Sequence, residues 1–200
     1  VTELLDGLEH FTKQPVYPEQ FGARIYKITR DPQGLRLTHM KITGGTLSVK
    51  ETLELGDVPG ALQEKVNQIR IYSGEKYQMV QEVRAGGVCA VAGLEHTHAG
   101  QGLGIEQGEN RFVLEPAMSY GVLLPEGADV HRALQQLKQL EEEDPQLHIA
   151  WNSQTEEIQI QLMGEVQLEI LKEVIRQRFD LDIEFGEGKV AYKETIAEPV

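Results

Sequence analysis

The 200-residue chain has a formal net charge of −13 and 40% hydrophobic residues, a composition typical of a globular protein with one or two domains and unlike that of a disordered chain. No apolar run approaches the roughly 20 residues that span a bilayer, and no charged and apolar leader opens the chain, so we expect a cytoplasmic protein without a membrane partner. The acidic balance argues against broad adhesion to nucleic acid, and the single cysteine, Cys89, excludes an internal disulfide framework and fits a reducing compartment.

Residues 1–20 combine a short helix with a linker. Apolar residues recur at helical spacing in VTELLDGLEHF, at Leu4, Leu5, Leu8 and Phe11. The following TKQPVYPEQFG contains two prolines and a glycine, which is typical of a linker. A lone short helix before a linker predicts the tail of a domain that precedes this chain.

Residues 21–108 are predicted to form a small closed β-barrel, because short β-like runs alternate with turn residues and none shows helical spacing. The predicted strands are residues 23–30, 35–43, 46–55, 64–73, 75–83 and 87–94. The predicted turns are Asp31–Gly34, Gly44–Gly45, Ser73–Gly74 and Ala85–Gly87. The glycine-rich residues 99–104 lack the GxGxxG spacing and are interpreted as a turn at the rim of the barrel.

A local basic face is predicted within this barrel, although the chain as a whole is acidic. Basic residues cluster in its first two predicted strands, at Arg24, Lys27, Arg30, Arg36 and Lys41. We take Arg24, Lys27, Arg36 and Lys41 as candidates for an interface.

Residues 109–200 alternate between strand and helix patterns. In chain order they predict a strand over 110–125, a helix over 128–145, a hairpin over 146–162, a helix after Gly164 and extended chain over 180–196. Asp129 is the predicted N-cap of the first helix, Pro145 ends it, and Asn152–Ser153 form the hairpin turn. The order β-α-β-β-α-β predicts a ferredoxin-like domain.

A polar residue, Gln167, falls in the middle of the predicted apolar face of the second helix. That face comprises Val166, Leu168, Ile170, Leu171, Val174, Ile175 and Phe179. An unpaired buried amide costs about 1–3 kcal/mol, so Gln167 is either a satisfied core amide or a contact to a neighbouring domain or partner. Gly164 could admit an anion to the helix N-terminus, but Glu165 already answers the helix dipole and would repel phosphate.

Nothing in the sequence predicts catalytic, cofactor-binding or metal-ligating residues in this chain. The GxxxxGK[ST], GxSxG and HExxH patterns are absent. Glu95, His96 and His98 would give at most a partial metal shell and are interpreted as a solvated loop. Cys89 lies in the apolar run GVCAVAG and is interpreted as a buried strand residue, and the acidic run 141–144 as a solvated helix end.

Three segments of the second half resemble the third domain of the elongation factor G family. They contain EEDP at 142–145, MGEVQLEI at 163–170 and VAYKETI at 190–196, where the family typically shows EEDP, MGELHLEI and VAYRETI in the same order. Residues 22–53 and 82–103 resemble the family's second domain, a β-barrel shared with elongation factor Tu, and VTELLDGLEHF resembles the last helix of the preceding GTPase domain.

The resemblance implies the middle fragment of a translational GTPase that binds the ribosome. Its divisions would be the tail helix and linker at 1–20, the barrel at 21–108 and the ferredoxin-like domain at 109–200. GTP and Mg²⁺ would bind the full-length protein and not this chain, which should be inactive alone. In the family the barrel contacts small-subunit ribosomal RNA, and the remaining GTPase and tip domains are partners within the same protein, which we expect to be monomeric.

Within the family, the chain looks closer to the ribosome-protection proteins that release tetracycline. In that branch GKVQMEV replaces GELHLEI, and the chain has GEVQLEI. Glu165 and VAYKETI instead resemble the translocase, which is the alternative. A second alternative, of another class, is a non-catalytic module that binds RNA or protein. Gly164, Glu165 and Gln167 complete the interface candidates, and Gln167 is hypothesised to bond across a domain joint.

Overall fold

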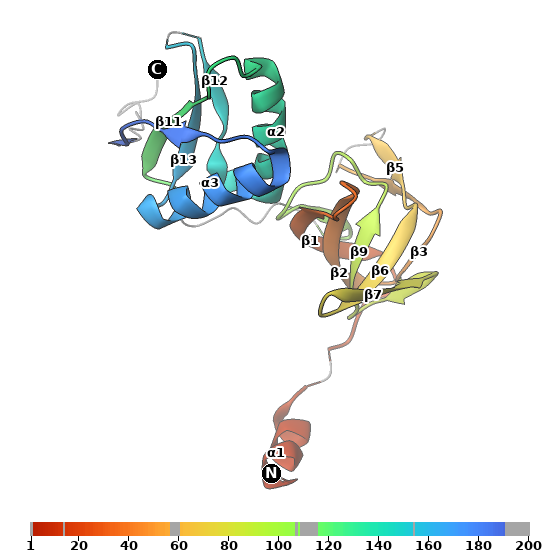
Figure 1. The fold of residues 1–200 in the computed structure, drawn as a ribbon. Coiled ribbons are helices and arrows are strands. Elements are labelled where there is room, and N and C mark those ends of the chain that lie inside the picture. The colour runs from red at the N-terminus through yellow and green to blue at the C-terminus, as the bar shows by residue number, and fades with distance from the viewer. Residues whose placement is uncertain are drawn as a thin grey trace, which may run out of the picture. The chain divides into compact units, whose positions relative to one another are not determined.

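The computed structural model describes residues 2–13, 15–56, 61–106, 108, 116–153 and 155–190. The chain divides into two compact units, Val1–Glu109 and Asn110–Val200, which we call the β unit and the α+β unit (Figure 1). Among the described residues, each helix is too short or too polar to cross a bilayer.

Strands of the β unit curve around one apolar core (Figure 1). Helix α1 (Thr2–Phe11) precedes them and buries none of its residues. The strands are β1 (Gly22–Arg30), β2 (Arg36–Gly44), β3 (Thr46–Ser48), β4 (Thr52–Glu54), β5 (Gln63–Lys65), β6 (Gln68–Ser73), β7 (Lys76–Val80), β8 (Glu82–Arg84), β9 (Val88–Ala92) and β10 (Gly102–Gly104). A six-stranded sheet has the order β10-β1-β2-β9-β6-β7, and the pairs β3-β8 and β4-β5 complete the unit.

Three of the predicted strands are each broken in two. The predicted strand 46–55 becomes β3 and β4, because Lys50 adopts a left-handed conformation with φ 73° and the Glu51 carboxylate accepts the Ser48 N–H at 2.8 Å. The predicted strands 64–73 and 75–83 become β5 with β6 and β7 with β8. The short pieces change sheets at these breaks, which lets an open sheet bend around its core.

Strand β10 corrects the interpretation of residues 99–104 as a turn, since part of this segment pairs with β1. A Cβ on Gly102 would lie 2.3 Å from the Glu106 carbonyl oxygen. A Cβ on Gly104, which has φ +64°, would lie 2.2 Å from the Phe21 carbonyl oxygen. The glycines therefore allow close approach of neighbouring backbone segments, a structural role that needs no bound ligand.

The α+β unit has the predicted ferredoxin-like order. Its elements are β11 (Met118–Leu123), α2 (Val130–Glu143), the 3₁₀ helix η1 (Pro145–Leu147), β12 (Ala150–Asn152), β13 (Glu157–Leu162), α3 (Glu165–Phe179), β14 (Glu184–Phe185) and β15 (Lys189–Val190). The sheet order is β12-β13-β11-β14, with β15 also beside β11 and every pairing antiparallel. Leu137, Ile160 and Ile175 are fully buried at the centre of its core.

Local features of the sequence predict where the first helix of this unit begins. The Asp129 side chain caps α2 by accepting the N–H groups of His131 and Arg132 at 2.9 and 3.2 Å. Pro145 does not itself end α2, since it begins η1 after the helix has stopped at Glu143. Of the predicted strand 110–125, residues 110–115 lie outside the described part of the chain, as do residues 191–196 of the last extended segment.

Helix α3 buries a narrower face than its sequence predicts. Leu171 and Ile175 are buried, whereas Val166 and Ile170 are 74% and 60% exposed. Gln167 consequently lies at the margin of the buried face and not in its middle. Part of the apolar arc of the helix therefore faces outward.

Candidate functional site

Two of the predicted basic residues lie on the outer face of the six-stranded sheet. Lys27 on β1 is the register partner of His39 on β2, and Lys41 lies two residues beyond His39 on the same face of its strand. Both lysine side chains are exposed, while Met40 between them on β2 points into the core. Lys27 and Lys41 therefore form a basic strip across two adjacent strands, beside His39.

Arg24 lies on β1, between Gly102 of the edge strand β10 and Lys41 of β2, and contacts the segment that follows β10. Its guanidinium donates to the Glu106 carboxylate at 2.7 Å and to the Gly108 carbonyl at 2.9 Å. The Thr43 hydroxyl and the Arg24 guanidinium lower the pKa of Glu106 below the usual carboxyl value. Arg24 is thus engaged with the chain segment that leaves β10.

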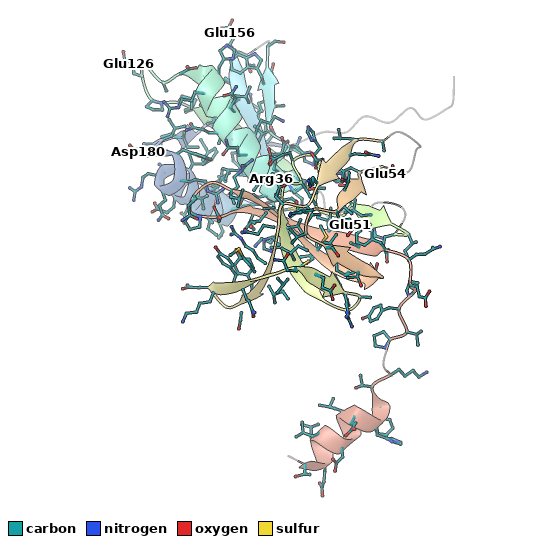
Figure 2. All side chains as sticks on the ribbon, turned by 90° about the vertical axis from the view of Figure 1, so that its right-hand side faces the viewer. Arg36, Glu51, Glu54, Glu126, Glu156 and Asp180 are labelled. Carbon is teal, nitrogen blue, oxygen red and sulfur yellow. The ribbon has the colours of Figure 1, made fainter. Side chains whose placement is uncertain are left out.

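Arg36, labelled in Figure 2, is buried and is not part of the basic strip. Its side chain donates to the hydroxyl of Thr97 at 3.0 Å, to that of Thr38 at 3.2 Å and to the backbone carbonyls of Leu94 and Thr97. These hydrogen bonds hold the loop after β9 against β2. The sequence predicts Arg36 as an interface residue, whereas in the structure the residue is only 3% exposed.

A row of aromatic rings crosses the outer face beside the basic strip, and it is not among the features predicted from the sequence. Ring centroids are separated by 6.1 Å between Tyr26 and His39, 6.0 Å between His39 and Tyr72, and 5.4 Å between Tyr72 and Tyr77. Small Ala90 on β9 separates His39 from β6 and leaves room for the rings to approach. The predicted turn at Ser73–Gly74 indicates one part of this row, because a hairpin at that turn places Tyr72 opposite Tyr77.

An ion pair lies beneath these rings. Arg70 Nη1 is 3.0 Å from Asp31 Oδ2, and the Arg70 guanidinium carbon lies 4.3 Å from the centroid of the Tyr77 ring. Burial by itself would raise the pKa of Asp31, but hydrogen bonds from the Leu35 N–H, Arg70 and the Gln33 N–H outweigh it and lower the pKa. Both side chains are therefore charged and neutralise each other inside the surface.

The environment of His39 in the aromatic row favours its neutral form. Its Nε2 lies 2.7 Å from the Thr29 hydroxyl. Burial and, second, the charge of Lys27 lower the pKa of His39 below its ordinary value. A neutral imidazole beside two lysines offers a stacking surface and a hydrogen-bonding edge without a further positive charge.

Gln167 is used locally at the beginning of α3. Its side-chain oxygen accepts the Met163 N–H at 2.9 Å, one residue before the N-cap Gly164, which has no side chain to cap the helix. This contact resembles the backward bond of a capping box, in which the third helical residue satisfies a preceding backbone donor. Glu165 is exposed in the first turn of the helix.

Neither a metal centre nor a reactive thiol is present in the described residues. They contain no group of three or more His, Cys, Asp or Glu side chains that could hold a metal ion. His96 Nδ1 instead lies 2.6 Å from the Glu64 carboxylate, which also accepts the Glu95 N–H at 2.8 Å and so anchors the loop. Burial raises the pKa of Cys89 to about 12, which keeps the thiol protonated.

Comparisons with known proteins show which proteins this chain resembles. Residues 113–187 match the family model for Elongation Factor G, domain III. Elongation factor G of Amoebophilus asiaticus (strain 5a2) is 29% identical over 201 residues, which cover 98% of this chain and 28% of that protein. A crystal structure of a Thermus thermophilus protein has a TM-score of 0.73 at 23% identity, covering 92% of this chain and 29% of that chain. The structural likeness shows that the fold is shared, and the chain spans under a third of either relative's length.

Proposed function

We propose that this chain is the middle part of a ribosome-binding translational GTPase of the tetracycline-protection type, which releases tetracycline from the ribosome at the expense of GTP. The observation that carries the ribosomal role is the alignment of 98% of the chain with an elongation factor G. The protection-type branch is supported by the motif GEVQLEI, whose Gln167 stands where the translocase motif has histidine.

GTP and Mg²⁺ would bind a domain outside this chain. The apolar residues of α1 support that proposal, because Leu4, Leu5, Leu8 and Phe11 are 55–82% exposed within the described structure. An amphipathic helix with this much exposed apolar surface needs a partner to pack against. Under the proposal that partner is the GTPase domain of the same monomeric protein.

The basic strip of the β unit would contact small-subunit ribosomal RNA. Lys27 and Lys41 project from adjacent strands, which suits contacts with successive phosphates. Because the chain as a whole has a net charge of −13, its binding to RNA would be restricted to this strip. Contacts of this kind weaken steeply with salt, so the affinity for ribosomes should fall as the salt concentration rises.

A translocase-like factor is the second candidate. The curated relative is itself named Elongation factor G, and this chain keeps the Glu165 of the translocase motif. A non-catalytic binding module would share the fold but would not couple to GTP.

Release of labelled tetracycline from ribosomes by the full-length protein separates these candidates. Release with GTP, and none with GDP, supports the protection-type function. Ribosome-stimulated GTP hydrolysis without release favours the translocase-like factor. Loss of both activities contradicts the proposal and leaves the binding module.

Substitutions at the basic strip test the RNA contact separately. Lys27→Gln with Lys41→Gln should weaken ribosome binding and reduce its dependence on salt, while thermal stability stays unchanged because both side chains are exposed. Lys138→Gln is a matched control, since Lys138 is exposed on α2 and pairs with Glu141 of the same helix. Equal salt dependence in the double variant and the control contradicts a contact through the strip.

A further inference from the structure

The outer face of the β unit contains a cavity of about 420 Å³ beside the aromatic row. Its lining includes the rings of His39, Tyr72 and Tyr77 and the charged side chains of Arg30, Asp31 and Arg70. This volume is within the range of sites that bind small ligands. The proposed function gives this cavity no role.

We infer that this cavity binds one unpaired nucleobase of RNA, stacked on Tyr72 and Tyr77. The inference rests on the proposed function only in identifying the RNA as ribosomal. Tyr72 and Tyr77 are 37% and 48% exposed, so their rings present free surface at the cavity mouth. Aromatic rings on a sheet, flanked by cations that follow a phosphate backbone, are the arrangement by which proteins bind single strands.

Charge cancellation inside the cavity favours a base over a phosphate. Arg70 is paired with Asp31 at 3.0 Å and is covered by the Tyr77 ring, so its positive charge is already neutralised and partly shielded. A phosphate entering the cavity would approach the Asp31 carboxylate, and Arg30, the other cation of the lining, already donates to the Gly34 carbonyl at 3.3 Å. A neutral, planar base meets no such repulsion.

The polar groups around the cavity suit the edge of a base. Thr29 and His39 share a 2.7 Å hydrogen bond that leaves the second ring nitrogen of His39 for a further partner. Glu75, exposed in the turn between β6 and β7, also lines the cavity and can accept from an exocyclic amine. Stacking therefore supplies the affinity, while these groups can add preference among the bases.

The flanking lysines explain why the base would belong to a nucleic acid strand and not to a free small molecule. Lys27 pairs in register with His39, and Lys41 continues along the same face of β2. A strand whose base enters the cavity would place neighbouring phosphates within reach of these two exposed side chains. The lysines position the strand, and the aromatic cavity distinguishes an unpaired base from a base held in a duplex.

The test is binding of three labelled RNA probes to the full-length protein by fluorescence anisotropy. The probes are an unstructured adenosine-rich octamer, an octamer with the same backbone and no bases, and a duplex of the same length. We expect the single strand to bind about tenfold or more tightly than either control. Tyr72→Ala with Tyr77→Ala should reduce its affinity to that of the strand without bases.

Conservative and distant variants keep this test independent of folding. Tyr72→Phe with Tyr77→Phe preserves the rings and should bind within about threefold of the wild type. Trp151→Ala removes an exposed aromatic residue from the α+β unit and should leave binding unchanged. Circular dichroism melting of each variant identifies any loss of folding. The phenylalanine variant, which keeps both rings, then shows whether the rings are sufficient for binding.

Equal affinity for strands with and without bases would overturn the inference, as would unchanged binding of the alanine variant. If the alanine variant loses ribosome binding but binds all three probes like the wild type, the cavity contacts a ribosomal protein and the inference is also wrong. Ribosome-stimulated GTP hydrolysis, measured separately, reports on the proposed function. Failure of the inferred base binding is therefore distinguishable from failure of the proposed function.

Discussion

Arg70 and Asp31 form an ion pair across the β unit, with 3.0 Å between Arg70 Nη1 and Asp31 Oδ2 and with side chains that are only 6% and 8% exposed. Arg70 lies on β6, and Asp31 lies in the turn between β1 and β2, so the pair joins segments 39 residues apart. Asp31 also fixes its own turn by accepting the N–H groups of Gln33 and Leu35 at 3.0 and 2.9 Å. The pair thus connects the local turn to the aromatic surface beneath Tyr77.

Asp31→Asn should destabilise the protein by about 3–5 kcal/mol, because it removes the carboxylate that neutralises the buried Arg70 charge. Urea unfolding measures this loss. Glu82→Gln, which removes an exposed pair with Arg84, is the control and should cost under about 1 kcal/mol. The lowered pKa of Asp31 also predicts that its stabilising contribution is present above the usual carboxyl value of 3.8 and is lost as the pH falls through the lower folded value. A destabilisation equal to that of the control would contradict the role of the buried pair.

His39 should become easier to protonate in Lys27→Met, because the neighbouring charge is one of the two causes that lower its pKa. NMR titration of the His39 ring measures the rise, and Lys138→Met is the control. Since the folded pKa lies below the ordinary value of 6.5, the wild type loses stability as the pH falls through that folded value. An unchanged His39 titration in Lys27→Met would mean that burial alone sets the pKa.

Gln167→Leu should destabilise the α+β unit by about 1 kcal/mol, because the Met163 N–H loses its partner while helix propensity barely changes. Gln167→Glu keeps an acceptor and places a negative charge near the helix N-terminus, so its stability should equal or exceed that of the wild type. Thermal unfolding compares the two variants. The domain-joint hypothesis makes a separate prediction, namely that Gln167→Leu lowers ribosome-stimulated GTP hydrolysis by the full-length protein. Unchanged hydrolysis would restrict Gln167 to its local cap.

Cys89 should resist thiol reagents in the folded protein, because it is buried and its pKa is raised to about 12. Labelling with a disulfide reagent should be slow in buffer and should accelerate with urea, in step with unfolding. The folded state favours the neutral thiol, so its stabilising contribution is complete below the ordinary value of 9.0 and declines as the pH rises towards 12. Rapid labelling without denaturant would show that β9 opens locally.

Much of the fold follows from local patterns in the sequence. Asp129 predicted the start of α2 because its side chain satisfies N–H groups of the adjacent helical turn. The turn residues at Ser73–Gly74 predicted the β6–β7 hairpin for a similarly local reason. The strands that divide, such as β3 and β4, could not be predicted so well, because their breaks depend on which distant segment each piece pairs with.

The sequence by itself determined the order of the elements, the β-rich unit followed by an α+β unit, and the likeness to elongation factor G, because spacing, turn residues and motifs are local properties of the chain. Only the tertiary structure decided which side chains share a surface. It buried Arg36 under the loop after β9 and turned Gln167 back to Met163. It also aligned Tyr26, His39, Tyr72 and Tyr77 from four strands, since strand register brings together residues that the sequence separates.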